Sequence, residues 1–264
     1  MQNRPTVVID KSYLRAASHD CMRGLAISHK FLVCESLTYE VSKDAPEIRA
    51  DVFSKLPEPT TGWEYIPSVS WLIDYERKYN IECGRPSSHI VKRDYSIIET
   101  LKNPKQQLPD NVSTAIKKLE HFFDDFSDAL LLQIENLFQT TTPKKAEEEL
   151  DALLKGEIRN EEKTNELIFS STGAKLPDIR RFTPNSVTFR YFQVMTLYSY
   201  DMRRRYNSID AIKNSTKARQ KILHDAHDLN YLILALLEGK FATQERKLQN
   251  WWNTMENSES LIHV

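Results

Sequence analysis

The sequence predicts an α/β protein in which a parallel sheet is flanked by helices and interrupted by a large, mainly helical insertion. Three short apolar runs, Thr6–Ile9, Lys30–Cys34 and Phe241–Thr243, predict strands. Their apolar residues do not alternate with polar ones, which suits a sheet that is buried on both faces. Only 6 glycines in 264 residues, together with 28% charged residues, argue against an all-β barrel or sandwich.

Helical periodicity accounts for most of the remaining chain. Apolar residues that recur at three- and four-residue steps between 113 and 139 predict a long amphipathic helix. Prolines make residues 44–110 irregular apart from one helix, and residues 155–180 fit a solvated loop or connector. The other expected helices cover residues 13–27, 37–41, 69–79, 144–154, 186–206, 216–237 and 247–255.

The order of these elements divides the chain into a split core and an insertion. Residues 1–45 and 207–255 form the expected α/β core, and residues 46–206 form the mainly helical insertion. The last segment, residues 256–264, is expected to be a frayed tail.

Composition bears on the setting and the partners of the protein. The net charge of −1 neither requires nor excludes a nucleic-acid partner. Cys21, Cys34 and Cys83 are odd in number and lack CxxC spacing, which favours a reduced, cytoplasmic protein. No apolar run reaches the roughly 18 residues that span a bilayer, and there is no apolar segment typical of a signal peptide. We therefore expect a soluble protein with no membrane partner.

Carboxylates stand where the expected strands end. Asp10 ends the first strand, Glu40 lies on the helix after the second, and Glu245 follows the last. Asp225 and Asp228 are three residues apart, so they share one face of a helix. Because parallel strands place their active sites at their carboxyl ends, we expect these side chains to converge. Such a cluster repels itself unless a divalent cation such as Mg²⁺ or Mn²⁺ binds there.

Four short motifs, in this order along the chain, resemble those of the PIN-domain family of nucleases. They are Val7-Val8-Ile9-Asp10, the segment from Phe31 to Glu40, Asp225-x-x-Asp228-Leu229, and Phe241-Ala242-Thr243-Gln244-Glu245. The family places an aspartate after the first strand, a glutamate after the second, an aspartate at the opening of a late helix and a final acidic residue after a last strand. The resemblance is confined to the two ends of the chain and does not extend to the helical middle.

The resemblance implies roles for these carboxylates. Asp10, Glu40 and Asp228 would be metal ligands and part of the catalytic site, and Asp225 an additional or alternative ligand on the same helix. Glu245 would be a further ligand, although the family more often has aspartate at this position.

The implied activity is metal-dependent hydrolysis of phosphodiester bonds, in RNA rather than DNA, with Mg²⁺ or Mn²⁺ as the cofactor. Water would attack in line and leave a 5′-phosphate and a 3′-hydroxyl. Ser12 would support the first aspartate, while Arg203, Arg204 and Arg205 would contact substrate phosphates.

Arginines and aromatic residues gather before the last acidic motif. The three clusters are Arg180-Arg181-Phe182, Arg190-Tyr191-Phe192 and Arg203-Arg204-Arg205-Tyr206. Arginine with aromatic residues is typical of single-strand nucleic-acid binding, and the pattern fits equally a helix whose aromatic residues pack inward while its arginines stay solvated. The insertion would restrict access to the substrate or mediate assembly, so a second copy of the chain or a regulatory protein is a further expected partner.

Other functions explain less of the sequence. A scaffold that keeps the fold and binds nucleic acid or protein without cleaving is the main alternative, since each carboxylate taken singly also fits a cap or a solvated helix position. The string His224-Asp225-Ala226-His227-Asp228 resembles the His-Asp element of HD phosphohydrolases but leaves the strands unexplained. Residues His19, Cys21, His29 and Cys34 lack zinc-ligand spacing. Neither a GxSxG elbow nor a P-loop motif is present.

Overall fold

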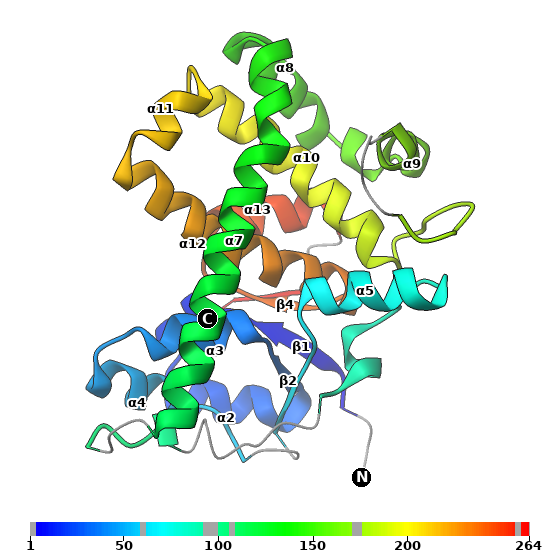
Figure 1. Cartoon of the computed structure of the whole chain (residues 1–264). Coiled ribbons are helices and arrows are strands. Elements are labelled where there is room, and N and C mark those ends of the chain that lie inside the picture. Colours follow the sequence, from blue (N-terminus) through cyan, green and yellow to red (C-terminus); the bar gives the residue numbers. More distant parts are fainter. Residues whose placement is uncertain are drawn as a thin grey trace.

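The computed structural model is an α/β protein built on a five-stranded parallel sheet with the strand order β3-β2-β1-β4-β5. It describes residues 4–58, 62–91, 100–105, 109–170, 176–256 and 260–263. In Figure 1 the sheet occupies the lower half of the molecule, and α8 to α11 form a helical layer above it. The strands are β1 (Thr6–Ile9), β2 (Lys30–Val33), β3 (Trp63–Tyr65), β4 (Phe241–Ala242) and β5 (Leu261–Ile262).

The central strands are the ones that the sequence predicts. Strand β1 pairs in parallel with β2 on one side, where Val7 lies opposite Phe31, and with β4 on the other, where Ile9 lies opposite Ala242. All four of these side chains are fully buried. This agrees with apolar runs that do not alternate, since both faces of the central sheet are covered.

The two outer strands lie outside the segments that we expected to form the sheet. Strand β3 lies inside 46–206, where we expected a mainly helical insertion, and it pairs with β2 and buries Trp63 and Tyr65. Strand β5 lies in the segment expected to be a frayed tail and pairs with β4. Both strands are only two or three residues long, which is too short to show a local hydrophobic periodicity. They are strands because they pair with a neighbouring strand.

Most of the predicted helices are present, although one is divided and unexpected helices form at Pro46–Ser54, in the region 44–110, and at Ile209–Lys213. The helix expected at 13–27 is divided because Ala17 is extended and the Ser18 side chain accepts a hydrogen bond from Cys21 N, which starts a new helix. A helix also forms within the expected connector at 155–180. The helices are α1 (Lys11–Ala16), α2 (His19–Ser28), α3 (Glu35–Ser42), α4 (Pro46–Ser54), α5 (Val69–Tyr79), α7 (Asp110–Thr140), α8 (Pro143–Leu154), α9 (Glu161–Ser170), α10 (Val187–Arg205), α11 (Ile209–Lys213), α12 (Thr216–Glu238) and α13 (Arg246–Met255), with short 3₁₀ turns η1 (Pro86–His89) and η2 (Glu157–Arg159).

Helix α12 is the central packing element. Residues 229–238 of this helix are all buried, and the helix contacts β1, α7 and α10. The long helix α7 runs past α3 and α12 from the bottom of the molecule to the top (Figure 1). Helix α12 therefore carries Asp225 and Asp228 to the sheet, and it also packs against α7 and α10. No helix in the described ranges is long and apolar enough to cross a membrane.

Candidate metal centre

Asp10 follows β1 directly and caps the first turn of α1. Its carboxylate accepts hydrogen bonds from Tyr13 N at 2.7 Å, from Thr243 Oγ1 at 2.5 Å and from Ser12 Oγ at 2.8 and 2.9 Å. Burial nonetheless raises the pKa of Asp10 from 3.8 to about 6, because desolvation raises this pKa by more than the hydrogen bonds lower it. The Asp10 carboxylate is therefore held rigidly and costs free energy when ionised.

Ser12 positions Asp10 and also connects it to β4. Its hydroxyl donates to Asp10 and accepts a hydrogen bond from Gln244 N at 2.9 Å, while Thr243 Oγ1 lies 3.3 Å away. The structure thus places Ser12 as a support for the first aspartate. Thr243, which sequence reasoning did not select as a site residue, is the equivalent support from the end of β4.

Glu40 projects from α3, which begins just after β2. Tyr231 in α12 donates a hydrogen bond of 2.8 Å to Glu40 Oε2, and Lys11 Nζ donates to the Glu40 carbonyl oxygen and to Asp44 Oδ1, each at 2.9 Å. Burial raises the pKa of Glu40 from 4.5 to about 7. The Tyr231 hydrogen bond and the Lys11 charge lower this pKa, while the charges of Asp10 and Asp44 raise it.

Asp228 lies on α12 and interacts electrostatically with the other carboxylates. Burial raises its pKa well above the ordinary value of 3.8, and the negative charges of Glu40, Asp225 and Glu245 raise it further. The positive charge of Lys247 acts in the opposite direction. Within the described ranges, the Asp228 carboxylate accepts no hydrogen bond. No hydrogen bond of the Asp228 carboxylate within the described ranges would therefore have to break for a cation to bind it.

Asp225 is in a different environment from Asp228, although it lies on the same helix. It is 1% exposed and forms ion pairs with Lys247 at 3.0 Å and with Lys221 at 3.3 Å. Its Oδ2 atom is buried and accepts no hydrogen bond within the described part of the chain. Two lysines therefore balance the charge of Asp225, which we expected to be an additional ligand.

Glu245 stands at the N-terminus of α13, and its side chain is exposed. Its backbone N donates to Thr243 Oγ1 at 3.0 Å, and its charge raises the pKa values of both Asp10 and Asp228. An exposed carboxylate at this point marks the solvent side of the cluster.

These contacts bring four predicted residues into one electrostatic cluster, which we call the acidic cluster: Asp10, Glu40, Asp228 and Glu245. All are oxygen donors of the kind that Mg²⁺ and Mn²⁺ prefer. In the described ranges, however, no three His, Cys, Asp or Glu side chains stand close enough together to hold a metal ion as placed. The donor chemistry fits a divalent cation, and chelation would require these side chains to move closer together.

The three consecutive arginines differ in exposure: Arg204 and Arg205 are exposed, and Arg203 is not. Arg203 is buried, donates to the Thr141 and Tyr206 carbonyl oxygens at 2.6 and 2.8 Å, and lies over the Phe138 ring. Arg204 and Arg205 form ion pairs with Asp201 at 2.8 and 2.6 Å. Arg203 therefore caps the C-terminus of α10 and bonds to the C-terminus of α7. The guanidinium groups of Arg204 and Arg205, which we expected to contact substrate, are each paired with Asp201.

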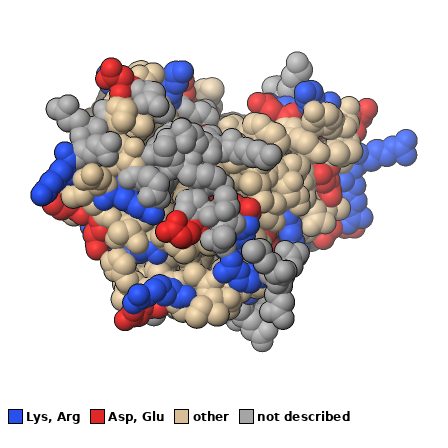
Figure 2. Space-filling view, turned by 90° about the horizontal axis from the view of Figure 1, so that it is seen from below, with Lys and Arg blue, Asp and Glu red and all other residues tan. Residues whose placement is uncertain are grey.

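The rest of the arginine and aromatic pattern also serves packing. Arg190 pairs with Glu256, and Phe182 is fully buried. Arg180 and Arg181 remain exposed. In Figure 2, on the face seen from below, lysines and arginines are interspersed with acidic residues wherever the surface is described.

His227 belongs to the core. It is 2% exposed, and its ring centroid lies 5.2 Å from that of Tyr39 and 4.0 Å from that of Phe123. Burial lowers the pKa of His227 to about 3, so the ring is uncharged at neutral pH. Burial also raises the pKa of the Cys34 thiol to about 11. These environments are those of packed side chains.

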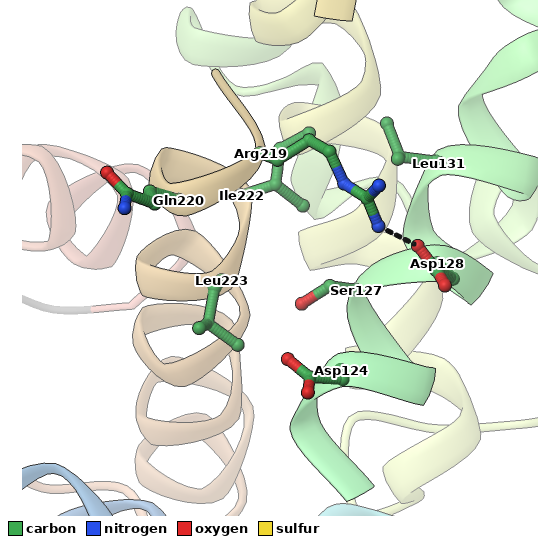
Figure 3. Close-up of a pocket in the computed structure, with 8 residues that line it drawn as sticks. All are labelled: Asp124, Ser127, Asp128, Leu131, Arg219, Gln220, Ile222 and Leu223. Carbon is green, nitrogen blue, oxygen red and sulfur yellow. Dashed lines mark hydrogen bonds and ion pairs between the residues drawn. The ribbon is translucent and has the colours of Figure 1, made fainter. Parts of the chain in front are cut away.

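A hollow of about 330 Å³ lies between α7 and the first half of α12 (Figure 3). The Arg219–Asp128 ion pair of 3.2 Å spans it. None of the predicted site residues lines it; its walls are Asp124, Ser127, Asp128, Leu131, Arg219, Gln220, Ile222 and Leu223.

Besides Thr243, sequence reasoning missed Lys11, Tyr231 and Lys247, which also contact the predicted site. Lys11 follows Asp10 directly and Lys247 lies two residues after Glu245, so adjacency to the acidic motifs was the available signal. Tyr231 lies three residues after Asp228, on the same face of α12. Comparisons with known proteins add nothing to this description: no family model, curated protein or solved structure is significantly similar to the chain.

Proposed function

We propose that the protein is a metal-dependent nuclease of the PIN-like type, with RNA rather than DNA as its substrate. The observation that carries the proposal is the electrostatic coupling of the buried Asp10 with the half-buried Glu40 and Asp228 at the carboxyl edge of a parallel sheet, with the pKa of each raised. Carboxylates that repel one another and are poorly solvated are stabilised when a divalent cation binds them. The strand order β3-β2-β1-β4-β5, with motifs at the ends of β1 and β4, supports the PIN-like expectation.

The proposed ligands are Asp10, Glu40 and Asp228, with Glu245 from the solvent side. When bound, Mg²⁺ or Mn²⁺ would supply charge for the scissile phosphate and acidify a water nucleophile. Ser12 and Thr243 hold the Asp10 carboxylate, and Tyr231 holds Glu40. These three hydroxyl groups keep two of the ligands oriented toward the same edge of the sheet.

A second function is favoured by a specific observation. Asp225 is already paired with two lysines, and in the described ranges no three candidate ligands stand together as placed. Both facts fit a PIN-like scaffold that binds nucleic acid or a protein partner without cleaving. The two functions differ in whether a divalent cation completes the cluster.

Cleavage of labelled single-stranded RNA and DNA in Mn²⁺ or Mg²⁺ tests the proposal. The variants are Asp10→Asn and Asp228→Asn, and the matched control is Asp20→Asn, whose side chain is 85% exposed and pairs with Arg23 on α2. We expect metal-dependent cleavage that is preserved in the control and lost in both site variants. Absence of metal-dependent cleavage, or activity unchanged by both site substitutions, would favour the scaffold.

A further inference from the structure

Lys247 is fixed at the inner edge of the acidic cluster. It is the second residue of α13, two residues after Glu245. Its Nζ atom lies 3.0 Å from Asp225 Oδ1 and 3.9 Å from Asp201 Oδ2. The Trp251 and Tyr198 ring centroids are 4.7 and 5.5 Å away, so carboxylates and aromatic faces together hold the ammonium group.

The ammonium group retains hydrogen-bonding capacity in this position. An ammonium group carries three N–H donors. Among the described residues Lys247 uses one of them, toward Asp225, because the 3.9 Å separation from Asp201 exceeds hydrogen-bond distance. Its side chain is 15% exposed, so the group is ordered yet not sealed from solvent. Two donors are therefore left for a ligand.

The position of Lys247 affects how many cations the cluster can hold. Two-metal sites place ions roughly 3.5–4 Å apart with carboxylates between them. Asp225 shares a helix face with Asp228 and would be the natural ligand for a second ion, but its charge is already matched by Lys247. A second divalent ion there would have to displace or repel the ammonium group.

We infer that Lys247 is a built-in cation of the site: its ammonium group occupies the place of a second metal ion and contacts the substrate phosphate, so that the cluster binds one divalent ion. This inference rests on the proposed nuclease function. A phosphodiester carries a negative charge that a compact ammonium group can bind with its free donors. Lys221 pairs with the same aspartate but is about half exposed, so it lacks the fixed placement.

The test is calorimetric titration of the full-length, EDTA-treated protein with Mn²⁺, combined with cleavage rates. We expect wild type to bind one Mn²⁺ per chain. Lys247→Gln should bind Mn²⁺ several-fold more tightly or take up a second ion, because a repelling charge is removed, while its cleavage rate falls on the order of 100-fold. Lys221→Gln, the matched control, should change neither quantity by more than about twofold, since the Lys221 ammonium group is about half exposed and solvent screens its charge. Lys247→Arg should keep the single ion.

A purely structural role for Lys247 would weaken metal binding and cleavage together, so opposite changes in the two quantities are the supporting result. The double variant Asp225→Asn with Lys247→Gln also removes the buried charge that the single variant would leave with Lys221 alone, and it serves if the single variant unfolds. Two Mn²⁺ ions per wild-type chain, or weaker Mn²⁺ binding in both Lys247→Gln and the double variant, would overturn the inference and leave the proposed function standing. Absence of Mn²⁺ binding in wild type would overturn both.

Discussion

Replacing Glu40 by glutamine should make the metal-free protein more stable at alkaline pH, although it removes a proposed ligand. Glu40 has a pKa of about 7 in the folded protein against an ordinary value of 4.5. Between these values the folded state holds a proton that the unfolded chain has released, so stability falls as pH rises through this window. Above pH 7 the ionised Glu40 carboxylate destabilises the folded state by the full amount.

The magnitude follows from the pKa difference. At 1.36 kcal/mol per pKa unit, the ionised Glu40 carboxylate destabilises the fold by about 3 kcal/mol at pH 8. Glutamine has nearly the same shape, and its carbonyl oxygen can still accept the hydrogen bond from Tyr231, which is 2.8 Å long in wild type. We expect Glu40→Gln to raise the free energy of unfolding by about 1–3 kcal/mol at pH 8 and to change it by less than about 0.5 kcal/mol at pH 4.5.

The assay is urea unfolding in EDTA at the two pH values, with Glu47→Gln as the control because Glu47 is exposed on α4. The control should change stability equally and slightly at both pH values. A Glu40→Gln protein that is less stable than wild type at pH 8, or a gain of the same size at both pH values, would refute the account of Glu40 as a buried, destabilising charge.

Three other predictions concern residues whose contacts are well defined. Thr243→Val removes the 2.5 Å hydrogen bond to Asp10, so the Asp10 pKa should rise above about 6 and the acid limb of the cleavage pH profile should move to higher pH; an unchanged limb would contradict this role. Glu76→Ala should lower the free energy of unfolding by about 3–5 kcal/mol, because this fully buried carboxylate accepts hydrogen bonds from the first residues of α10. The control, Asp74→Ala on the exposed face of α5, should lower it by under about 0.5 kcal/mol. Equal losses for the two variants in urea unfolding would contradict this role of Glu76. Ser18→Ala should cost about 1 kcal/mol through loss of the N-cap of α2, and a neutral effect would show that the break between α1 and α2 does not depend on this cap.

Local sequence signals predicted the elements that lie at the centre of the fold. The run Thr6–Ile9 is β1, and the periodicity at 69–79 is α5, with the same bounds. Strands β3 and β5 escaped prediction because their few residues become strands only by pairing with β2 and β4. The one break inside an expected helix, at Ala17, depended on a serine cap rather than on hydrophobic spacing.

The candidate site was predictable where it depends on strand ends and not where it depends on packing. Asp10 and Glu40 follow buried strands, so parallel topology was enough to bring them together. The neutralisation of Asp225 required knowing that α13 folds back onto α12 and places Lys247 beside it. Arg203 was predicted to contact phosphate because the local sequence does not show that it packs against Phe138. That residue lies on α7, which is distant in sequence. Tertiary contacts, which no local pattern reports, decide which charges remain available.

Thermal unfolding with and without Mn²⁺ at pH 8 tests most directly whether the buried carboxylates form a cation site, because it needs no knowledge of the substrate. A cation that binds the folded state stabilises it by about 2.7 kcal/mol at 100 times its dissociation constant, so the melting temperature of EDTA-treated wild type should rise by several degrees. The rise should shrink in Asp10→Asn and Asp228→Asn and remain in Asp20→Asn. A melting temperature that Mn²⁺ leaves unchanged, or raises equally in all four proteins, would contradict the metal centre and the nuclease proposal built on it.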